Sequence, residues 1–589
     1  MIANFIIDSM KRRQFLGEIT LASFSIPFLG SCKWIKKEEN TLRSMEYRSL
    51  SFHGFTQGQI LDKDLIKLGA KVGFNDVTIQ DDFNIYQYED SGIRNSFKRD
   101  AVNYLTKLKQ IFQQNGYFEF LREQGFTLSS WVHELDNYDE TWGPVTLDND
   151  LLWSKISERY QKALGEIFPE LDYVILTVTE SQRWIVQPGL LEKLANIINT
   201  QCKRSNMQLI LRTFTHNTMQ RDGIMAAVER LPDDIIIMTK SVPQDWGMRG
   251  INNPIIGKIN RKKQYIEACT WGEYSAGQHV ANCRIYNEFK PQFDFWNQNN
   301  IQGFNVRVTR GNSSVLNNAQ EANLWFLGYA TSGKSIDPDK ALHDFSEEKF
   351  GPENAEIMAK VLRNTGYVIA EAMYVKDFSF GKTAFRNPIE RTTRGVWCKP
   401  SLQGWEVVRQ EGLKTAEPYA DDEDLYHANP FNYQWDPHHW DKSYYPEYLK
   451  VRRGDPQIIR EEEEAYKKAL SIAEDHLQML ENVKEKLPIG GYDFFKFKLE
   501  ENKYVLIFMN EMQLAWLKAE RSQYTEQEKE IPDLKSEIYD HLKNVERLYE
   551  EFNSEQKQVM WQGREYKMTR FGAYDIPDTL AEFKRFWKL

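Results

Sequence analysis

The chain has few cysteines, and none of them is spaced to hold a metal. Its 589 residues include five cysteines, of which Cys202, Cys269, Cys283 and Cys398 are far apart, with no Cys-x-x-Cys pair. The common zinc sites need closely spaced pairs of cysteine or histidine ligands. The sequence has no such cysteine pair and therefore offers no zinc motif. The spacing leaves room for one disulfide in an oxidising compartment. Cys269 lies inside an apolar run, where we expect a small buried hydrophobic residue.

An excess of positive charge and long hydrophobic runs are also missing. Lys and Arg number 75 against 85 Asp and Glu, which gives a net charge of −10. This balance argues against non-specific binding of nucleic acid, so we expect no nucleic-acid partner. After residue 40 no apolar run reaches the length of a membrane span. A chain of this length exceeds one typical core and is expected to form two or three domains.

The N-terminus resembles an export signal. The string MKRRQFL at 10–16 is similar to a twin-arginine motif, and the apolar run at 19–29 is too short to span a membrane. The string LGSC at 29–32 resembles a bacterial lipobox, which implies cleavage before Cys32 and lipidation of that residue. The alternative is an ordinary signal peptide in which Cys32 stands by chance. We expect an exported protein anchored to a bacterial membrane, in the periplasm or at the cell surface.

The lipid anchor predicts a change in fractionation. If Cys32 carries the lipid, Cys32→Ser should move the protein from membranes into the soluble fraction. Fractionation with a lipid label measures this, and unchanged membrane association with no label lost would contradict it. In this interpretation 1–31 is the signal peptide and 32–45 a lipid-anchored tether.

Eight short β-type runs, each followed by a helical stretch, dominate the next part of the chain. This alternation indicates βα units and a parallel sheet. Eight units in roughly 260 residues fit a closed (β/α)8 TIM barrel of the α/β class, in which the active site lies at the C-terminal ends of the strands. The runs are at 47–54, 76–80, 127–134, 172–180, 207–216, 234–240, 264–273 and 303–310.

The remainder of the chain changes character twice. We expect the catalytic barrel at 46–335, followed at 336–455 by helices and an aromatic-rich loop region that covers the barrel. Residues 456–589 show helical periodicity with charged, solvated faces, and we expect a mainly helical C-terminal domain.

Carboxylates stand where the fourth and seventh runs end. Glu180 closes the fourth run, Glu273 closes the seventh, and alternation points Glu267 into the upper part of the barrel. Paired carboxylates are what glycoside hydrolysis needs. Glu180 has an alternative role as a helix N-cap or as a partner of Arg183.

Cations at the same ends give a sharper indication. Arg212, Lys240, Arg307 and Arg310 stand on the fifth, sixth and eighth runs. Neutral sugars need no such group, whereas Arg matches a carboxylate or sulfate with two parallel hydrogen bonds. We therefore expect these residues, with Glu267, to bind an anionic substrate. The alternative is internal pairing between the cations and the glutamates.

Three further side chains are candidates for moving protons. His133 and His216 stand at the ends of the third and fifth runs, and Tyr274 follows Glu273. Each has a side chain able to carry a proton in a reaction. The alternative is a structural role, which is common for a single histidine at a strand end. With Glu180 and Glu273 they complete the predicted catalytic set.

One stretch resembles a known family. The strings EANLWFLG at 321–328, SIDPD at 335–339 and HDFSEEKFGPE at 343–353 are similar to the end of the barrel and the first helices of α-glucuronidase-like glycosidases. The resemblance implies a carbohydrate-active TIM barrel acting on uronic acids. The layout is also similar to lipoproteins of polysaccharide-degrading Bacteroidetes-type bacteria, among them ulvan oligosaccharide dehydratases.

Together these features predict an enzyme acting on oligosaccharides that contain uronic acid. The first expectation is a carbon–oxygen lyase that dehydrates a terminal glucuronic or iduronic acid of an ulvan-type oligosaccharide to its 4,5-unsaturated form. Removal of the C5 proton next to a carboxylate needs nearby cations and a His, Tyr or Lys base. An α-glucuronidase-like hydrolase is the alternative, and a non-catalytic glycan-binding lipoprotein is the third reading. No cofactor is expected, and a divalent metal stays open.

Overall fold

The computed structural model describes residues 44–53, 61–80, 109–134, 142–178, 187–214, 218–242, 252–272, 279–310, 313–376, 378–379, 447, 450–451, 453–552, 556–570, 580–581 and 584. By its internal contacts the chain divides into residues 1–42 and 43–589, and every described residue belongs to the second unit. Cys32, the proposed lipid anchor, lies outside the described residues.

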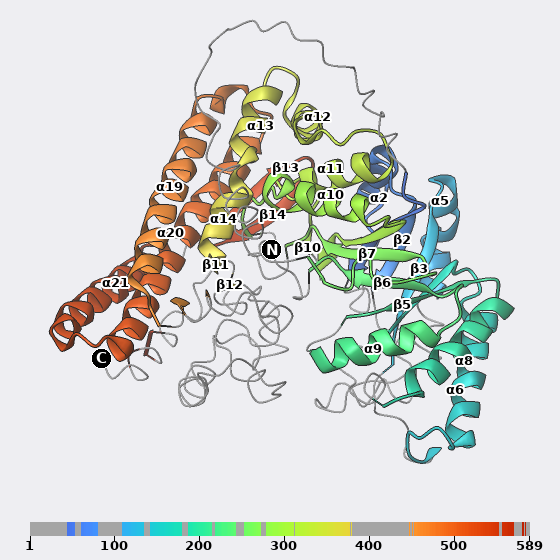
Figure 1. Cartoon of the computed structure of the whole chain (residues 1–589). Coiled ribbons are helices and arrows are strands. Elements are labelled where there is room, and N and C mark those ends of the chain that lie inside the picture. The colour runs from blue at the N-terminus through green and yellow to red at the C-terminus, as the bar shows by residue number, and fades with distance from the viewer. Residues whose placement is uncertain are drawn as a thin grey trace, which may run out of the picture. The chain divides into compact units, whose positions relative to one another are not determined.

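The predicted barrel is present. Eight parallel strands close in the order β1 to β8, each paired with its neighbours in sequence and β8 paired with β1 (Figure 1). This confirms the predicted (β/α)8 fold. The strands are β1 (Tyr47–His53), β2 (Asp76–Gln80), β3 (Thr127–His133), β4 (Tyr173–Thr177), β5 (Gln208–Arg212), β6 (Ile236–Lys240), β7 (Gln264–Cys269) and β8 (Gly303–Arg307).

Helices follow the strands and cover the outer face of the sheet. The strands β6, β7 and β8 are buried at every position, as expected for parallel strands between a packed interior and a helical layer. The connecting helices are α2 (Lys63–Val72), α5 (Tyr117–Glu123), α6 (Asp150–Lys162), η3 (Ala163–Ile167), α8 (Leu190–Arg204), α9 (Thr218–Arg230), η5 (Ile285–Phe289), α10 (Lys290–Gln298) and α11 (Glu321–Thr331).

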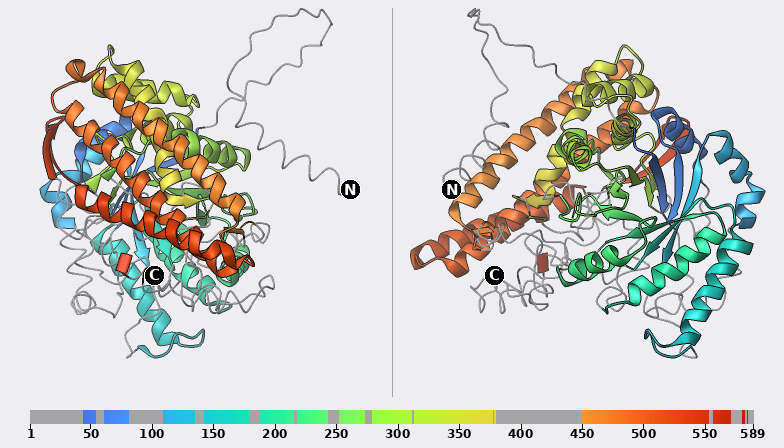
Figure 2. Two further views of the ribbon diagram at one scale, coloured as in Figure 1. Left: turned by 90° about the vertical axis from the view of Figure 1, so that its left-hand side faces the viewer. Right: turned by 45° about the vertical axis from the view of Figure 1, so that its right-hand side comes forward.

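A helical region follows the barrel, as predicted. Its core contains residues of α14, α19, α20 and α21, and Figures 1 and 2 both show α19, α20 and α21 side by side. Among the described helices none is both long and apolar enough to cross a membrane. The helices are α12 (Pro338–Phe350), α13 (Ala355–Arg363), α14 (Thr365–Met373), α19 (Pro456–Glu481), α20 (Gly491–Tyr524) and α21 (Ile531–Phe552), with short helices η8 (Lys484–Lys486) and η9 (Glu528–Glu530).

Short antiparallel hairpins complete the described structure. The largest joins β13 (Gln556–Trp561) to β14 (Arg564–Thr569) through Gln562 and Gly563, which both have positive φ. A two-residue turn of this kind matches the twist of a hairpin. The periodicity of residues 456–589 predicted helices and no strands in this part of the chain. The smaller pairs are β9 (Thr309–Arg310) with β10 (Ser313–Ser314), and β11 (Tyr374–Val375) with β12 (Phe378–Ser379).

At the N-terminal ends of the strands, the interior of the barrel is filled by aromatic rings and a buried carboxylate. Tyr47 and Tyr265 stack with centroids 5.0 Å apart, and a Cβ at Gly303 would lie 2.8 Å from the Tyr265 ring, so glycine leaves the space that the pair needs. Asp76 is fully buried and accepts hydrogen bonds from Thr127 Oγ1 at 2.6 Å and from Ser129 Oγ at 2.9 Å. Burial raises the pKa of Asp76 to about 6, against the hydroxyl donors, which lower it.

The Asp76 carboxyl predicts a pH-dependent contribution to stability. Its pKa is higher in the folded than in the unfolded chain, so its contribution is most favourable when it is protonated and is lost as pH rises from about 4 to about 6. The ionised form costs about 3 kcal/mol at neutral pH. The free energy of unfolding of Asp76→Asn, relative to that of the wild type, should therefore be higher at neutral pH than at about pH 4. Urea unfolding of both proteins at the two pH values measures this. A difference independent of pH would contradict it.

Candidate active site

An ion pair joins β5 and β7 inside the barrel, near the C-terminal ends of the strands. Arg212, the last residue of β5, donates from Nε to Glu267 Oε2 at 2.5 Å and from Nη2 to Oε1 at 2.9 Å. Both side chains are buried. In the sheet, β6 lies between β5 and β7. The two side chains therefore meet over the inner face of β6, inside the barrel. The structure therefore brings together two of the predicted substrate-binding residues.

Aromatic rings and a hydroxyl hold this pair in place. The Arg212 guanidinium carbon lies 4.5 Å from the ring centroid of Trp131 and 4.8 Å from that of Phe214. Arg212 Nη1 also donates to Thr177 Oγ1 at 3.2 Å. The guanidinium is stacked as well as hydrogen-bonded, which fixes its orientation. For Arg212 and Glu267, internal pairing is thus the arrangement that the structure has.

Lys240 and Arg307 lie at the same level of the barrel. Lys240 ends β6 directly beside Glu267, and its Nζ lies 3.8 Å from the Phe214 ring centroid. Arg307 ends β8, two residues after Asn305, which donates to Thr78 Oγ1 of β2 inside the barrel at 2.8 Å. Alternation along a strand places Arg307 on the same inner face.

We call Arg212, Lys240, Glu267 and Arg307 the cationic layer. All four side chains are buried, and they contribute three positive charges and one negative charge. These four described side chains therefore carry a net positive charge. Buried charge of one sign favours an opposite charge in the same site.

The side chains of the other predicted site residues lie outside what the structure describes. For His133 and Arg310 the structure gives only the backbone, at the end of β3 and in β9. The remaining four are not described: Glu180, His216, Glu273 and Tyr274. Their catalytic roles stay predictions.

Several strands end earlier than the sequence suggested, among them β4, β5 and β7. The expected runs closed at 180, 216 and 273, whereas β4, β5 and β7 end at Thr177, Arg212 and Cys269. The ladders set these limits, since β4 pairs with β5 only as far as Thr177 and Arg212. Glu180, His216 and Glu273 therefore come after the last strand residue in sequence.

Several residues around the site were not predicted from the sequence. Trp131, Thr177 and Phe214 all contact Arg212, and Trp131 is two residues before His133 in β3. That period of two was the signal that would have found Trp131. Glu134 accepts from Tyr160 Oη at 2.6 Å and from Arg159 at 2.8 Å, so it fastens β3 to α6.

The three cysteines that the structure describes are free thiols: Cys202, Cys269 and Cys283. Cys269 is buried at the end of β7, as expected for a small hydrophobic residue. Burial raises the pKa of its thiol, opposed by the positive charges of Arg307 and Arg284. Cys269 is therefore a neutral, packed side chain.

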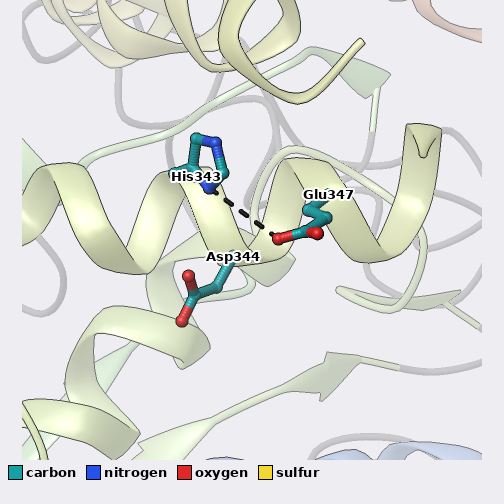
Figure 3. A group of neighbouring side chains, drawn as sticks. All are labelled: His343, Asp344 and Glu347. Carbon is teal, nitrogen blue, oxygen red and sulfur yellow. Dashed lines mark ion pairs between the residues drawn. The ribbon is translucent and has the colours of Figure 1, made fainter. Parts of the chain in front are cut away.

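One group of side chains in the described residues has a composition found in metal sites. His343, Asp344 and Glu347 lie on α12, and His343 Nδ1 is 4.0 Å from Glu347 (Figure 3). Asp344 Oδ2 already accepts from Lys340 at 2.8 Å and from Tyr329 Oη at 2.9 Å. His343 and Glu347 are half exposed. Because these contacts account for the group as surface ion pairs, we assign no metal to it.

Comparison with known proteins adds one informative likeness. No family model and no curated protein matches the sequence. Among solved structures, the chain is similar to a GH138 enzyme targeting pectin rhamnogalacturonan II, with a TM-score of 0.52 and 11% identity over 92% of this chain and 67% of that one. What the two share is the fold. The structure titled CpGH84B gives a TM-score of 0.41 and 10% identity over 91% of this chain and 77% of that one, too low to carry an argument.

Proposed function

We propose that this chain is a carbohydrate-active enzyme that acts on an acidic oligosaccharide at the C-terminal end of its barrel. The observation that carries the proposal is the cationic layer, in which three cations accompany one carboxylate. An arginine matches a carboxylate or sulfate with two parallel hydrogen bonds. Lys240 and Arg307, which end β6 and β8 at the catalytic end of the barrel, are the residues proposed to meet the substrate anion.

Hydrolysis of a glycosidic bond to a uronic acid is the reaction that we propose first. It is supported by the likeness to the GH138 enzyme, which targets a pectin polysaccharide. Hydrolysis needs one carboxylic acid to protonate the leaving oxygen and one carboxylate to act as base or nucleophile. Glu180 and Glu273 are proposed for these roles, because both follow strands at the catalytic end. Glu267 is a poor candidate, because both of its oxygens bind Arg212.

Dehydration of a terminal uronic acid is the second candidate, and the charge of the cationic layer favours it. A base removes the C5 proton, the C4–oxygen bond breaks, and water leaves with a 4,5 double bond formed. The negative charge that develops beside the carboxylate is stabilised by nearby cations. Lys240 and Arg307 suit that role, with His133, His216 or Tyr274 as the base.

Product analysis separates these functions. The protein is incubated with oligosaccharides from ulvan, xylan and pectin, and the products are weighed by mass spectrometry while ultraviolet absorbance is followed. Cleavage with gain of one water indicates a hydrolase. Loss of one water with absorbance of a conjugated uronate indicates the dehydratase. Binding without any product supports a glycan-binding protein, and the absence of both product and binding overturns the proposal.

The lipid anchor on Cys32 would place the reaction at a bacterial membrane.

A further inference from the structure

The C-terminal region contacts three consecutive βα connections of the barrel. Its residues bind the segments that follow β7, β8 and β1, and these three strands are neighbours in the closed sheet. The connections after the strands form the catalytic end of such a barrel. The helical region is thus attached at the same end as the cationic layer.

The segment after β7 is held by a side chain of α20. Asn502 Oδ1 accepts from the Ala281 N–H at 2.9 Å, and Asn502 Nδ2 donates to the Ala281 carbonyl at 2.7 Å. Asn502 is 1% exposed and lies 221 residues further along the chain. Its amide satisfies both polar groups of one peptide residue, in the way that a neighbouring strand does.

Other buried side chains continue the same pattern. Asn323 of α11 accepts from the Arg284 N–H at 2.8 Å and donates to the Asn282 carbonyl at 3.1 Å. Thr365 of α14 accepts from the Cys283 N–H at 2.9 Å. Side chains of three helices therefore hold the backbone from Ala281 to Arg284 by hydrogen bonds, so this segment is a packed connection and not a solvated loop.

The other end of this βα connection is fixed as well. Thr270 and Trp271 donate their N–H groups to the Arg307 carbonyl at 3.0 and 3.1 Å. The Arg284 side chain reaches back to the carbonyl of Cys269, the last residue of β7. Both ends of the connection are thus tied to the strands that present Glu267 and Arg307.

The β13–β14 hairpin binds the next two connections. Trp561 Nε1 donates to the Asn317 carbonyl at 2.8 Å, after β8. Arg564 makes a bidentate pair with Asp62 at 2.6 and 2.9 Å, and Asp62 is the N-cap of α2, after β1. A paired arginine of this kind fixes direction as well as distance.

We infer that Asn502 and Arg564 are positioning residues for the catalytic end, so that the C-terminal region is part of the active-site scaffold and not an independent module. The inference rests on the proposed function. Small displacements of groups at an active site reduce the rate strongly, since reacting groups need near-contact geometry. Loss of these bonds should therefore act on turnover more than on substrate binding.

The decisive variant is Asn502→Leu, which keeps the size of the side chain but removes both bonds to Ala281. We expect kcat to fall by about 10- to 100-fold with KM changed by no more than about threefold. Hydrogen exchange should rise across residues 280–284. Arg564→Met should behave in the same way for the first turn of α2, and Arg564→Lys should recover part of the loss by restoring the charge.

The matched control is Asn354→Leu. Asn354 is also a fully buried amide, but it bonds the carbonyls of Phe350 at 2.9 Å and Lys486 at 3.0 Å, which belong to no βα connection. We expect a similar fall in Tm with kcat within about twofold of the wild type, because the catalytic end is untouched.

Three outcomes separate the possibilities. If Asn502→Leu keeps the wild-type kcat below its Tm, or if its effect on kcat equals that of Asn354→Leu, Asn502 only stabilises the fold and the inference is overturned. Unchanged exchange across 280–284 overturns it too. If the wild type acts on no acidic oligosaccharide, the proposed function fails, and the exchange data still decide whether Asn502 orders the segment after β7.

Discussion

Glu180→Gln and Glu273→Gln should each lower kcat on an acidic oligosaccharide by about 100- to 10,000-fold, which is the contribution of a positioned acid or base. The reason is that glycoside hydrolysis splits its two proton-transfer or nucleophilic roles between two carboxylates. Amides of the same size can take neither role. Steady-state kinetics on the substrate found by product analysis, with Tm measured beside them, test the prediction.

The controls for this test come from the competing chemistry. His133→Ala, His216→Ala and Tyr274→Phe should keep most of the activity in a hydrolase, where these side chains only contact the substrate. Glu166 is an exposed residue of η3. Glu166→Gln is therefore the control for the same chemical change away from the catalytic end of the barrel. If a His or Tyr variant is the inactive one and both glutamate variants stay active, the dehydratase takes the place of the hydrolase.

Arg307→Met should weaken transition-state binding of the acidic substrate by about 2–4 kcal/mol, in the range of a removed charged donor. Arg307 is chosen because it belongs to the cationic layer but not to the Arg212–Glu267 pair. Substrate whose carboxyl group has been reduced should be poor for the wild type and should lose little more with the variant. Equal activity of the wild type on acidic and reduced substrates would end the proposal of an anionic substrate.

Arg212 needs a different design. Arg212→Met alone leaves Glu267 buried without its partner, and breaking a buried pair in this way destabilises proteins by about 3–5 kcal/mol. The double variant Arg212→Met with Glu267→Gln removes both charges together. Activity retained by the double variant, with Arg307→Met inactive, assigns the pair to structure and Arg307 to the substrate.

Much of the fold could be read from the sequence because the signals are local. Apolar runs such as Ile236–Lys240 alternate with helical stretches, and this rhythm depends only on neighbouring residues. The strand ends were less accurate, since a strand stops where its neighbour stops pairing. The β13–β14 hairpin was missed, because its Gln-Gly turn is a weaker signal than Asn-Gly.

The sequence by itself determined the barrel and placed Arg212, Lys240, Glu267 and Arg307 near its catalytic end, since the period of two along a strand fixes which side chains face inward. Only the tertiary structure decided which of them pair. Arg212 meets Glu267 because the curvature of the closed sheet turns the inner faces of β5 and β7, which lie one strand apart, toward each other. Asn502 binds Ala281 for the same kind of reason, because packing brings together residues 221 positions apart, a choice of partner that no local pattern contains.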